Sequence, residues 1–395
     1  MIAGLIFATE AADERPEALA ATLPFGGMTL LEYQARLLIA AGASHIMVAV
    51  ARVTPALLGA VNRIAKRGAA VDVVRSAEEA AARAHPLASV IVIADALVTT
   101  EPAVRAIAGA QPDTLMVIAE PGTPAAVERV DADHVWAGLA SLTNDRLKEI
   151  AALPREYDFQ STLLRVSVQG GAAKLVLPPS AKRAGHGVER QAAALASRSN
   201  AVLAALANSR TDWPDRFLFT PFSRIALPQL VARSVPVWAV AAASGVLTGA
   251  GLVAMALGHE AIGLIAAILG VALLSTGSLL SWLRGDDRRA RGQEIAIAAI
   301  AGASILVSGV AASRRDDTLT AVVLALTLFA AATIAERARG RGRLWWGSPS
   351  AYLLTLGPFA LVGFTALGLG VAAAYAMATL AAAVEVLRKT GLGRN

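Results

Sequence analysis

The stretch that decides the fold is VPVWAVAAASGVLTGAGLVAMAL (235–257), followed after Gly258-His259-Glu260 by AIGLIAAILGVALLSTGSLLSWL (261–283). Neither apolar segment contains a charged residue. A helix needs about 20 apolar residues to cross the hydrocarbon core of a bilayer, and both segments exceed that length. Because only three residues separate them, the sequence predicts an antiparallel hairpin of two membrane-spanning helices.

The rest of the second half repeats this pattern. Further apolar segments predict spans at 295–313, 318–335, 351–367 and 371–387, the last two cut from one long run near Gly368-Leu369-Gly370. We therefore predict an all-α bundle of six transmembrane helices in residues 235–395. Residues 191–234 are expected to be a linker. Its end, 214–234, mixes arginines with apolar side chains, which favours an amphipathic helix in the membrane interface over a plain connection.

The arginines of the second half predict its orientation. The loop between spans two and three and the loop between spans four and five contain four arginines each, and the C-terminal tail contains Arg388, Lys389 and Arg394. The turn between spans one and two and the turn between spans five and six contain none. Short loops rich in Lys and Arg face the cytoplasm. We therefore expect both termini on the cytoplasmic side of the inner membrane.

The composition of the whole chain agrees with a membrane protein that carries one additional domain. Apolar residues make up 55% of the 395 residues and charged residues 17%. The net charge of +6 would suit nucleic acid if it lay on a soluble surface, but many of the arginines lie in loops between apolar spans, where they face anionic lipid. We therefore expect a bilayer as partner and no nucleic acid. No cysteine is present, which excludes disulfides and thiolate metal sites.

The first half alternates short apolar runs with helical periodicity. Strands are expected at 2–8, 45–50, 71–74, 88–95, 114–119 and 135–139, and helices lie between most of them. This alternation predicts a mostly parallel sheet covered by helices on both faces. The N-terminal run is followed by acids and preceded by no basic segment, so we interpret it as the first strand and not as a signal peptide.

The run LPFGGMTLLEYQARLLIAAGASHIMVAV (23–50) resembles sugar-nucleotide and molybdopterin-type nucleotidyltransferases, in which P-x-G-G-x-x-L-L-E-Y leads a helix that ends in A-G-A or A-G-V before a strand. The resemblance implies a Rossmann-like nucleotidyltransferase domain over 1–190. It places Asp95, at the end of VIVIAD, where the family has its metal-binding aspartate. An active head would then require Mg²⁺ and a nucleotide. Asp95 can also be interpreted as a polar residue that ends a strand.

The family's glycine-rich phosphate loop is not kept. FATEAADER (7–15) stands in its place, without a glycine and with three acidic residues. Only Arg15 matches the family pattern, and no lysine precedes Lys66. Backbone amides and a cation are what hold a triphosphate in such loops. We therefore expect at most a vestigial nucleotide site at Arg15 and Asp95. Asp131 or Asp133 could supply a second metal ligand.

The membrane domain is similar to the CDP-alcohol phosphotransferase family, in which an amphipathic helix precedes six spans. That family holds two metal ions with D-x-x-D-G-x-x-A-R-x8-G-x3-D-x3-D. Here the register gives LLSTGSLLSWLRG, with Ser275, Thr276, Gly277 and Ser281 in place of the motif residues, and the third span has no aspartate. We interpret Asp286 and Asp287 as a solvated loop. Glu294 could be a remnant of the motif, although an interfacial residue is favoured.

Three hypotheses follow from these resemblances. The first is a catalytically degenerate protein that acts as a binding, regulatory or assembly partner in phospholipid or polar-headgroup synthesis, beside an active paralogue or as a homodimer. The second is a divergent transferase that uses Asp95 with Asp131 or Asp133. The third is a lipid or small-solute carrier. Ionisable residues inside the spans are missing apart from Glu385, which argues against an ion pump.

Overall fold

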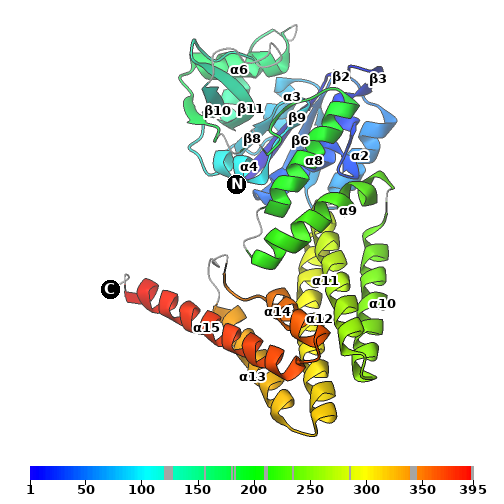
Figure 1. The fold of residues 1–395 in the computed structure, drawn as a ribbon. Coiled ribbons are helices and arrows are strands. Elements are labelled where there is room, and N and C mark those ends of the chain that lie inside the picture. Colours follow the sequence, from blue (N-terminus) through cyan, green and yellow to red (C-terminus); the bar gives the residue numbers. More distant parts are fainter. Residues whose placement is uncertain are drawn as a thin grey trace. The chain divides into compact units, whose positions relative to one another are not determined.

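The computed structural model describes residues 1–119, 128–154, 157–178, 181, 184–208, 212–233, 235–283, 286–338 and 345–392. The chain forms two compact units, Met1–Val202 and Leu203–Asn395. The first unit contains a sheet and helices, and the second unit is helical (Figure 1). This confirms the predicted fold class, an α/β domain followed by an all-α region.

The first unit is built on a seven-stranded sheet in the order β12-β10-β11-β8-β1-β6-β7. β1 pairs in parallel with β6 and β8, β6 with β7 and β10 with β12, whereas β11 is antiparallel to both of its neighbours. The sheet is therefore mostly parallel, as the alternating pattern predicts. The strands are β1 (Ile2–Ala8), β6 (Ala43–Val50), β7 (Ala70–Val74), β8 (Ser89–Ile93), β10 (Thr114–Ala119), β11 (His134–Thr143) and β12 (Ala173–Val176).

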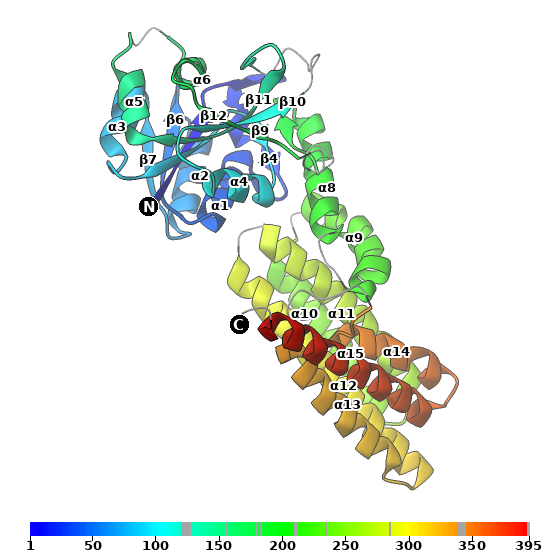
Figure 2. The ribbon, with the colours of Figure 1, turned by 90° about the vertical axis from the view of Figure 1, so that its left-hand side faces the viewer.

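Six helices pack around this sheet in two groups. One group is α1 (Leu30–Ala40), α2 (Pro55–Ala65) and α4 (Glu101–Ala108); the other is α3 (Ala77–Arg83), α5 (Asn144–Ala151) and α6 (Phe159–Gln169). Figure 2 shows the groups on opposite sides of the sheet. Short pairs complete the unit: β2 (Ala11–Ala12) with β3 (Arg15–Leu19), β4 (Pro24–Phe25) with β5 (Met28–Thr29), and β9 (Leu97–Val98) with β13 (Gly187–Val188). α8 (Ala192–Asn208) follows.

The second unit consists of helices of very different lengths. A π-helical turn, η2 (Asp215–Phe219), leads into α9 (Thr220–Ala232), over most of the segment expected to lie in the interface. The apolar helices are α10 (Val237–Ala256), α11 (Glu260–Leu283), α12 (Asp287–Asp316), α13 (Thr320–Ala338), α14 (Pro349–Leu361) and α15 (Thr365–Leu392). Five of them, α10 to α13 and α15, are long and apolar enough to cross a membrane.

The fifth predicted span differs from its prediction. α14 has 13 residues, and the chain turns at Gly363, whose φ is +83°, and not near Gly368-Leu369-Gly370. Gly368 lies inside α15, where a Cβ would come 2.6 Å from the Cβ of Phe359. Gly368 therefore serves the close packing of α15 on α14. Because α14 is short, the number of passes remains a prediction.

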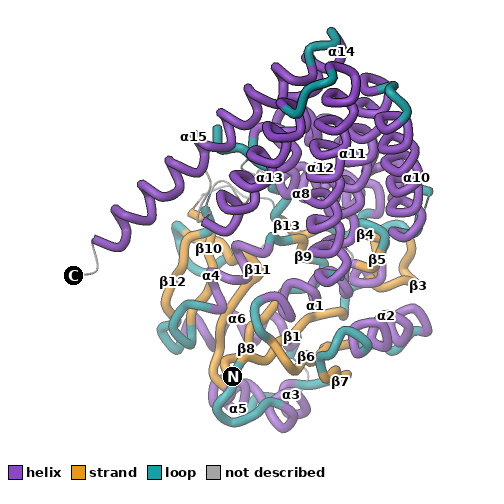
Figure 3. Tube along the Cα trace, turned by 90° about the horizontal axis from the view of Figure 1, so that it is seen from below, coloured by secondary structure: helices purple, strands orange, loops and turns teal. Residues whose placement is uncertain are grey.

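Small residues let the first hairpin close tightly. A Cβ added to Gly251 would lie 2.7 Å from the carbonyl oxygen of Gly263 on the facing helix. Ser244 on α10 also donates to the Gly270 carbonyl across the same contact, at 2.7 Å. α10, α11 and α12 consequently lie side by side (Figure 3). Such close backbone approach is the usual way in which helices associate without a hydrophobic driving force.

Several of the arginines that predict the orientation lie outside the described residues. Arg284, the three arginines between 339 and 344, and Arg394 belong to segments that the structure does not describe.

Candidate functional site

Asp95 follows β8 at the carboxyl end of the parallel strands, where α/β sheets usually bind their ligands. Its segment is held by the helix that follows the P-x-G-G motif. Tyr33 donates its hydroxyl to the Thr99 carbonyl at 2.7 Å, and Gln34 donates to the Leu97 carbonyl at 2.9 Å. Tyr33 of the motif and the adjacent Gln34 therefore fix the backbone at Leu97 and Thr99, shortly after Asp95.

The two carboxylate oxygens of Asp95 have different surroundings. Oδ2 accepts hydrogen bonds from the backbone amides of Thr9 and Glu10, the latter at 2.7 Å, and from the Thr9 hydroxyl at 3.0 Å. Oδ1 is buried and has no hydrogen-bond partner. Burial raises the pKa of Asp95 to about 6, although the hydrogen bonds from Thr9 and Glu10 act in the opposite direction. The first βα loop thus directs its amides at a carboxylate of the protein itself.

A cavity of about 460 Å³ lies beside this loop. It is lined by Thr9, Glu10, Asp13, Glu128, Asp158, Gln160, Ser161, Val188, Glu189 and Arg190. Five of these side chains are acidic and one is basic. The single arginine, Arg190, pairs with Glu10 at 3.3 Å, and Glu189 pairs at 3.3 Å with Arg198, which lies outside the lining. The cavity therefore presents an excess of negative charge, which disfavours a triphosphate.

Three residues that line this cavity, Glu128, Asp158 and Gln160, were not predicted as site residues from the sequence. Gln160 accepts a hydrogen bond from the Asp95 amide at 2.8 Å, and Asp158 caps α6 by accepting from the Ser161 amide at 2.8 Å. Glu128 accepts from the Ser161 hydroxyl at 3.0 Å. The Asp158-x-x-Ser161 spacing is a helix-start signal, but it does not reveal that this helix begins beside Asp95.

The other residues singled out in the sequence lie elsewhere. Arg15 is exposed on the small strand β3. Asp131 accepts hydrogen bonds from Lys174 and from the His134 ring, which together with two backbone amides hold the pKa of this carboxyl below its usual range. Asp133 is exposed in the same turn, and its amide donates to Asp131 at 2.8 Å.

The arrangement around Asp95 does not suit a nucleotide-bound Mg²⁺. Such an ion needs several oxygen ligands, usually one or two carboxylates with substrate phosphates. Oδ2 of Asp95 already accepts hydrogen bonds from three donors. Within the described ranges, no three Asp, Glu or His side chains are grouped so that they could hold a metal ion.

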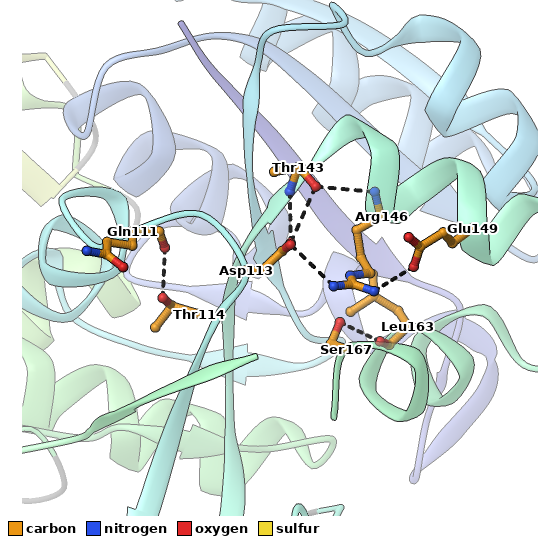
Figure 4. Close-up of polar contacts among 8 residues, drawn as sticks. All are labelled: Gln111, Asp113, Thr114, Thr143, Arg146, Glu149, Leu163 and Ser167. Atoms are coloured by element: carbon orange, nitrogen blue, oxygen red, sulfur yellow. Dashed lines mark hydrogen bonds and ion pairs between the residues drawn. The ribbon is translucent and has the colours of Figure 1, made fainter. Parts of the chain in front are cut away.

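A second polar network lies at the opposite end of the sheet, where Thr143 of β11 pairs with Ser89 at the start of β8. Asp113 accepts from the Thr143 amide at 3.2 Å and pairs with Arg146 at 3.4 Å; Arg146 also pairs with Glu149 at 2.5 Å (Figure 4). Every charged member therefore has a partner of opposite sign. The network ties α5 to the sheet.

The membrane unit has hydroxyls where the resemblance would place acids. Thr276 hydrogen-bonds with Ser223 of α9 at 2.9 Å, and Ser281 donates to Gln293 of α12 at 2.8 Å. Asp286 caps α12 by accepting from the Arg289 amide at 3.1 Å, which gives it a structural role. The bonds made by Thr276 and Ser281 connect α9, α11 and α12 through uncharged groups.

The chain has low similarity to the solved structures that it matches. No protein-family model and no curated protein matches the chain. Among solved structures, one described as a glucose-1-phosphate thymidylyltransferase from Bacillus anthracis, in complex with sucrose, matches with a TM-score of 0.40 and 10% identity, over 51% of this chain and 95% of that chain. The inositol-1-phosphate CTP transferase from T. maritima matches with a TM-score of 0.37 and 13% identity, over 45% and 85% of the two chains.

Proposed function

We propose that this chain is a membrane-anchored, catalytically degenerate relative of bifunctional headgroup enzymes, acting as a binding, regulatory or assembly partner in phospholipid or polar-headgroup synthesis. One observation carries the proposal: Asp95 occupies the amides of Thr9 and Glu10. In the resembled family, amides of this loop hold the nucleotide phosphates. A buried carboxylate in that place competes with phosphate for the same donors.

The electrostatics of the cavity support the same proposal. Its five carboxylates face a single arginine that is already paired. Binding a triphosphate there would bring like charges together in a partly buried site, which costs several kcal/mol. The membrane unit gives parallel support, because Ser275, Thr276 and Ser281 cannot replace the carboxylates of a two-metal site.

The remaining expectations belong to this proposal. The arginine-rich loops support an inner-membrane protein with both termini in the cytoplasm. An active paralogue or another lipid-synthesis enzyme is the proposed partner, and a homodimer through the membrane helices is a further possible assembly.

A complementation experiment tests the proposal. The polar-lipid headgroups of a strain lacking this gene are compared with those of strains carrying wild-type protein, Asp95→Ala or, as a surface control, Asp145→Ala, whose side chain is 82% exposed. A binding or regulatory role predicts that both variants restore the wild-type lipid profile equally. Loss of complementation by Asp95→Ala alone, with normal protein levels, would contradict it.

A divergent transferase is the second candidate, favoured by the unpartnered Oδ1 of Asp95. A buried carboxylate oxygen without a donor is available to a metal ion or a proton. Calorimetry of the full-length protein in nanodiscs with CTP and Mg²⁺ distinguishes the candidates. The transferase requires saturable micromolar binding that Asp95→Ala abolishes, whereas the degenerate protein gives no binding heat with either form.

A further inference from the structure

A second cavity, of about 500 Å³, forms a groove along α6, next to the acidic cavity. Asp158, Ser161, Arg165 and Val168 line it at spacings of three or four residues, so one face of the helix and its cap borders the groove. At about 1.5 Å per residue, the 11 residues of α6 give this face a length of about 16 Å. We call this surface the α6 groove.

The α6 groove is open at its rim. Tyr157 is 54% exposed, and Arg129 and Arg165 are exposed as well. The apolar lining is more covered, with Leu164 only 3% exposed. A small-molecule site usually encloses about 70–90% of the surface of its ligand. The open rim therefore suits a chain segment that lies along the surface better than an enclosed small molecule.

The positive charges of the α6 groove are not balanced by the described residues. Neither Arg129 nor Arg165 forms an ion pair within the described part of the chain. Arg165 instead stacks over Tyr157, with its guanidinium carbon 5.3 Å from the ring centroid. The two acids, Glu128 and Asp158, belong to the wall shared with the acidic cavity, and each already accepts a hydrogen bond. The stacking holds one guanidinium in place, so less freedom is lost when it binds an anion.

Tyrosine and arginine, the side chains at this rim, are enriched among the residues that contribute most to protein–protein binding. We infer that the α6 groove binds an extended, acidic segment of a partner protein, an inference that rests on the proposed binding or assembly role and names the surface for it. Carboxylates of the segment pair with Arg129 and Arg165, whose forked donors match carboxylate oxygens. Its aliphatic side chains pack against Leu164 and Val168. At about 3.3 Å per residue, about five residues of extended chain cover the length of the helix.

Fluorescence anisotropy with full-length protein in phosphatidylcholine nanodiscs tests the inference. The probe is a fluorescein-labelled peptide of sequence Leu-Glu-Leu-Glu-Leu. Its controls are Leu-Gln-Leu-Gln-Leu, which lacks the charges, and Ser-Glu-Ser-Glu-Ser, which lacks the aliphatic side chains. Saturable binding of the probe, at least about tenfold tighter than that of either control, is the expected result. No saturable binding of the probe, or equally tight binding of the uncharged peptide, would overturn the inference.

Arginine variants locate the binding. Arg129→Gln combined with Arg165→Gln is expected to weaken probe binding at least about tenfold. Arg83→Gln combined with Arg105→Gln removes the same charge from exposed positions of α3 and α4 and is expected to leave binding unchanged. Loss of binding in this control pair as well would contradict the inference.

A charge reversal separates recognition from a folding defect. Arg129→Glu combined with Arg165→Glu is expected to lose the probe and to bind Leu-Lys-Leu-Lys-Leu instead. A glutamate variant that unfolds at the wild-type urea midpoint and does not gain the basic peptide would contradict the pairing of these arginines with carboxylates.

A second arm distinguishes a protein segment from an anionic lipid. Probe binding is repeated with dihexanoyl phosphatidylglycerol or dihexanoyl phosphatidylcholine added below the critical micelle concentration. Equal affinities in the two lipids support a protein segment. Displacement of the probe by the phosphatidylglycerol alone would assign the groove to lipid headgroups and overturn the inference. None of these outcomes depends on Asp95, so their failure would leave the complementation test of the proposed function unaffected.

Discussion

Asp95 and Asp113 lie at opposite ends of the same sheet and differ in how their charge is balanced. Asp113 pairs with Arg146 and accepts from Thr143. Asp95 is buried, accepts only from uncharged donors on one oxygen, and has no partner on the other. The pairing of Asp113 with Arg146 thus stabilises the contact between α5 and the sheet. A carboxylate without such a pairing carries an energetic cost that a stabilising role does not explain.

Replacing Asp113 should have the largest effect. Asp113→Ala leaves Arg146, whose side chain is 14% exposed, without its partner across the sheet. It also places alanine at a φ of +57°. We expect a loss of about 3 kcal/mol in the unfolding free energy of the first unit. Urea unfolding of full-length protein in detergent, followed by hydrogen exchange of head peptides, measures it.

Asp113→Asn is the matched control for that variant. Asparagine tolerates a positive φ and keeps an acceptor for the Thr143 amide, so it removes only the charge. Its effect should fall between wild type and alanine. Equal stability of wild type and Asp113→Ala would show that the Arg146 network does not support the fold.

Asp95→Asn should change stability in the opposite direction. The folded pKa of about 6 lies above the usual value of 3.8, which corresponds to a cost of about 3 kcal/mol at pH 7. The folded state binds more protons between these two pKa values, so this cost is absent below about pH 3.8, grows between pH 3.8 and pH 6, and changes little at higher pH. Because asparagine cannot ionise, the variant should be more stable at pH 7 by about 1–2 kcal/mol, part of the cost being offset by its weaker acceptor.

The pH dependence provides the measurement for Asp95→Asn. Urea midpoints of wild type and variant are compared from pH 3.5 to pH 7.5, and the stability of the variant relative to wild type should increase between about pH 4 and pH 6 and stay constant above that. A wild type that gains stability over Asp95→Asn as the pH rises would contradict the assigned direction of the pKa shift.

Gly170→Ala should lower the unfolding free energy by less than Asp113→Ala, because it disturbs only Arg146, the partner of Asp113. A Cβ at Gly170 would overlap the guanidinium of Arg146, but that group is the flexible end of a side chain and can shift. We expect a loss of about 1 kcal/mol. Gly109→Ala is the control, because its Cβ would meet the Arg105 carbonyl oxygen at an ordinary 3.5 Å. Equal stability of the two variants would mean that Arg146 moves without cost.

Lys174→Ala should have the smallest effect on stability. It removes the main cause of the lowered pKa of Asp131, so that pKa should rise towards 3.8. The stability linked to Asp131 is present above pH 3.8 and is lost as the pH falls further, and Lys174→Ala should reduce this loss. Unfolding midpoints of both proteins between pH 2 and pH 5 measure it. An identical acid dependence would contradict the assigned role of Lys174.

The sequence predicted the strands of the sheet better than the relations between their ends. The apolar runs at 2–8 and 114–119 correspond to β1 and β10. β12 was missed because its residues are mostly exposed and carry no strong apolar pattern. The bonding of Asp95 to Thr9 and Glu10 joins positions more than 80 residues apart, so only the parallel pairing of β1 with β8 brings them together.

The candidate site illustrates the same limit. The acids of the 7–15 loop and the position of Asp95 were visible in the sequence. Glu10 and Asp13 line the cavity, and Asp95 is hydrogen-bonded to the amides of Thr9 and Glu10 beside it. Glu128 and Gln160 gave no signal of their own, and the helix-start signal at Asp158 has the same pattern in a cap and in a binding site. The place of Asp158 and Gln160 depends on how α6 packs on the sheet, which local propensities do not specify.

The shortness of α14 makes the thickness of the surrounding bilayer relevant to this protein. At 1.5 Å per residue, its 13 residues extend about 20 Å, whereas the hydrocarbon core is about 30 Å thick. A helix that starts at one bilayer surface then ends about 10 Å before the other. The turn that follows is apolar, with Val362 and Phe364 70% and 63% exposed. Lipids with shorter acyl chains would reduce this mismatch at α14 but increase it at the five longer helices, so the bilayer is expected to thin locally around α14.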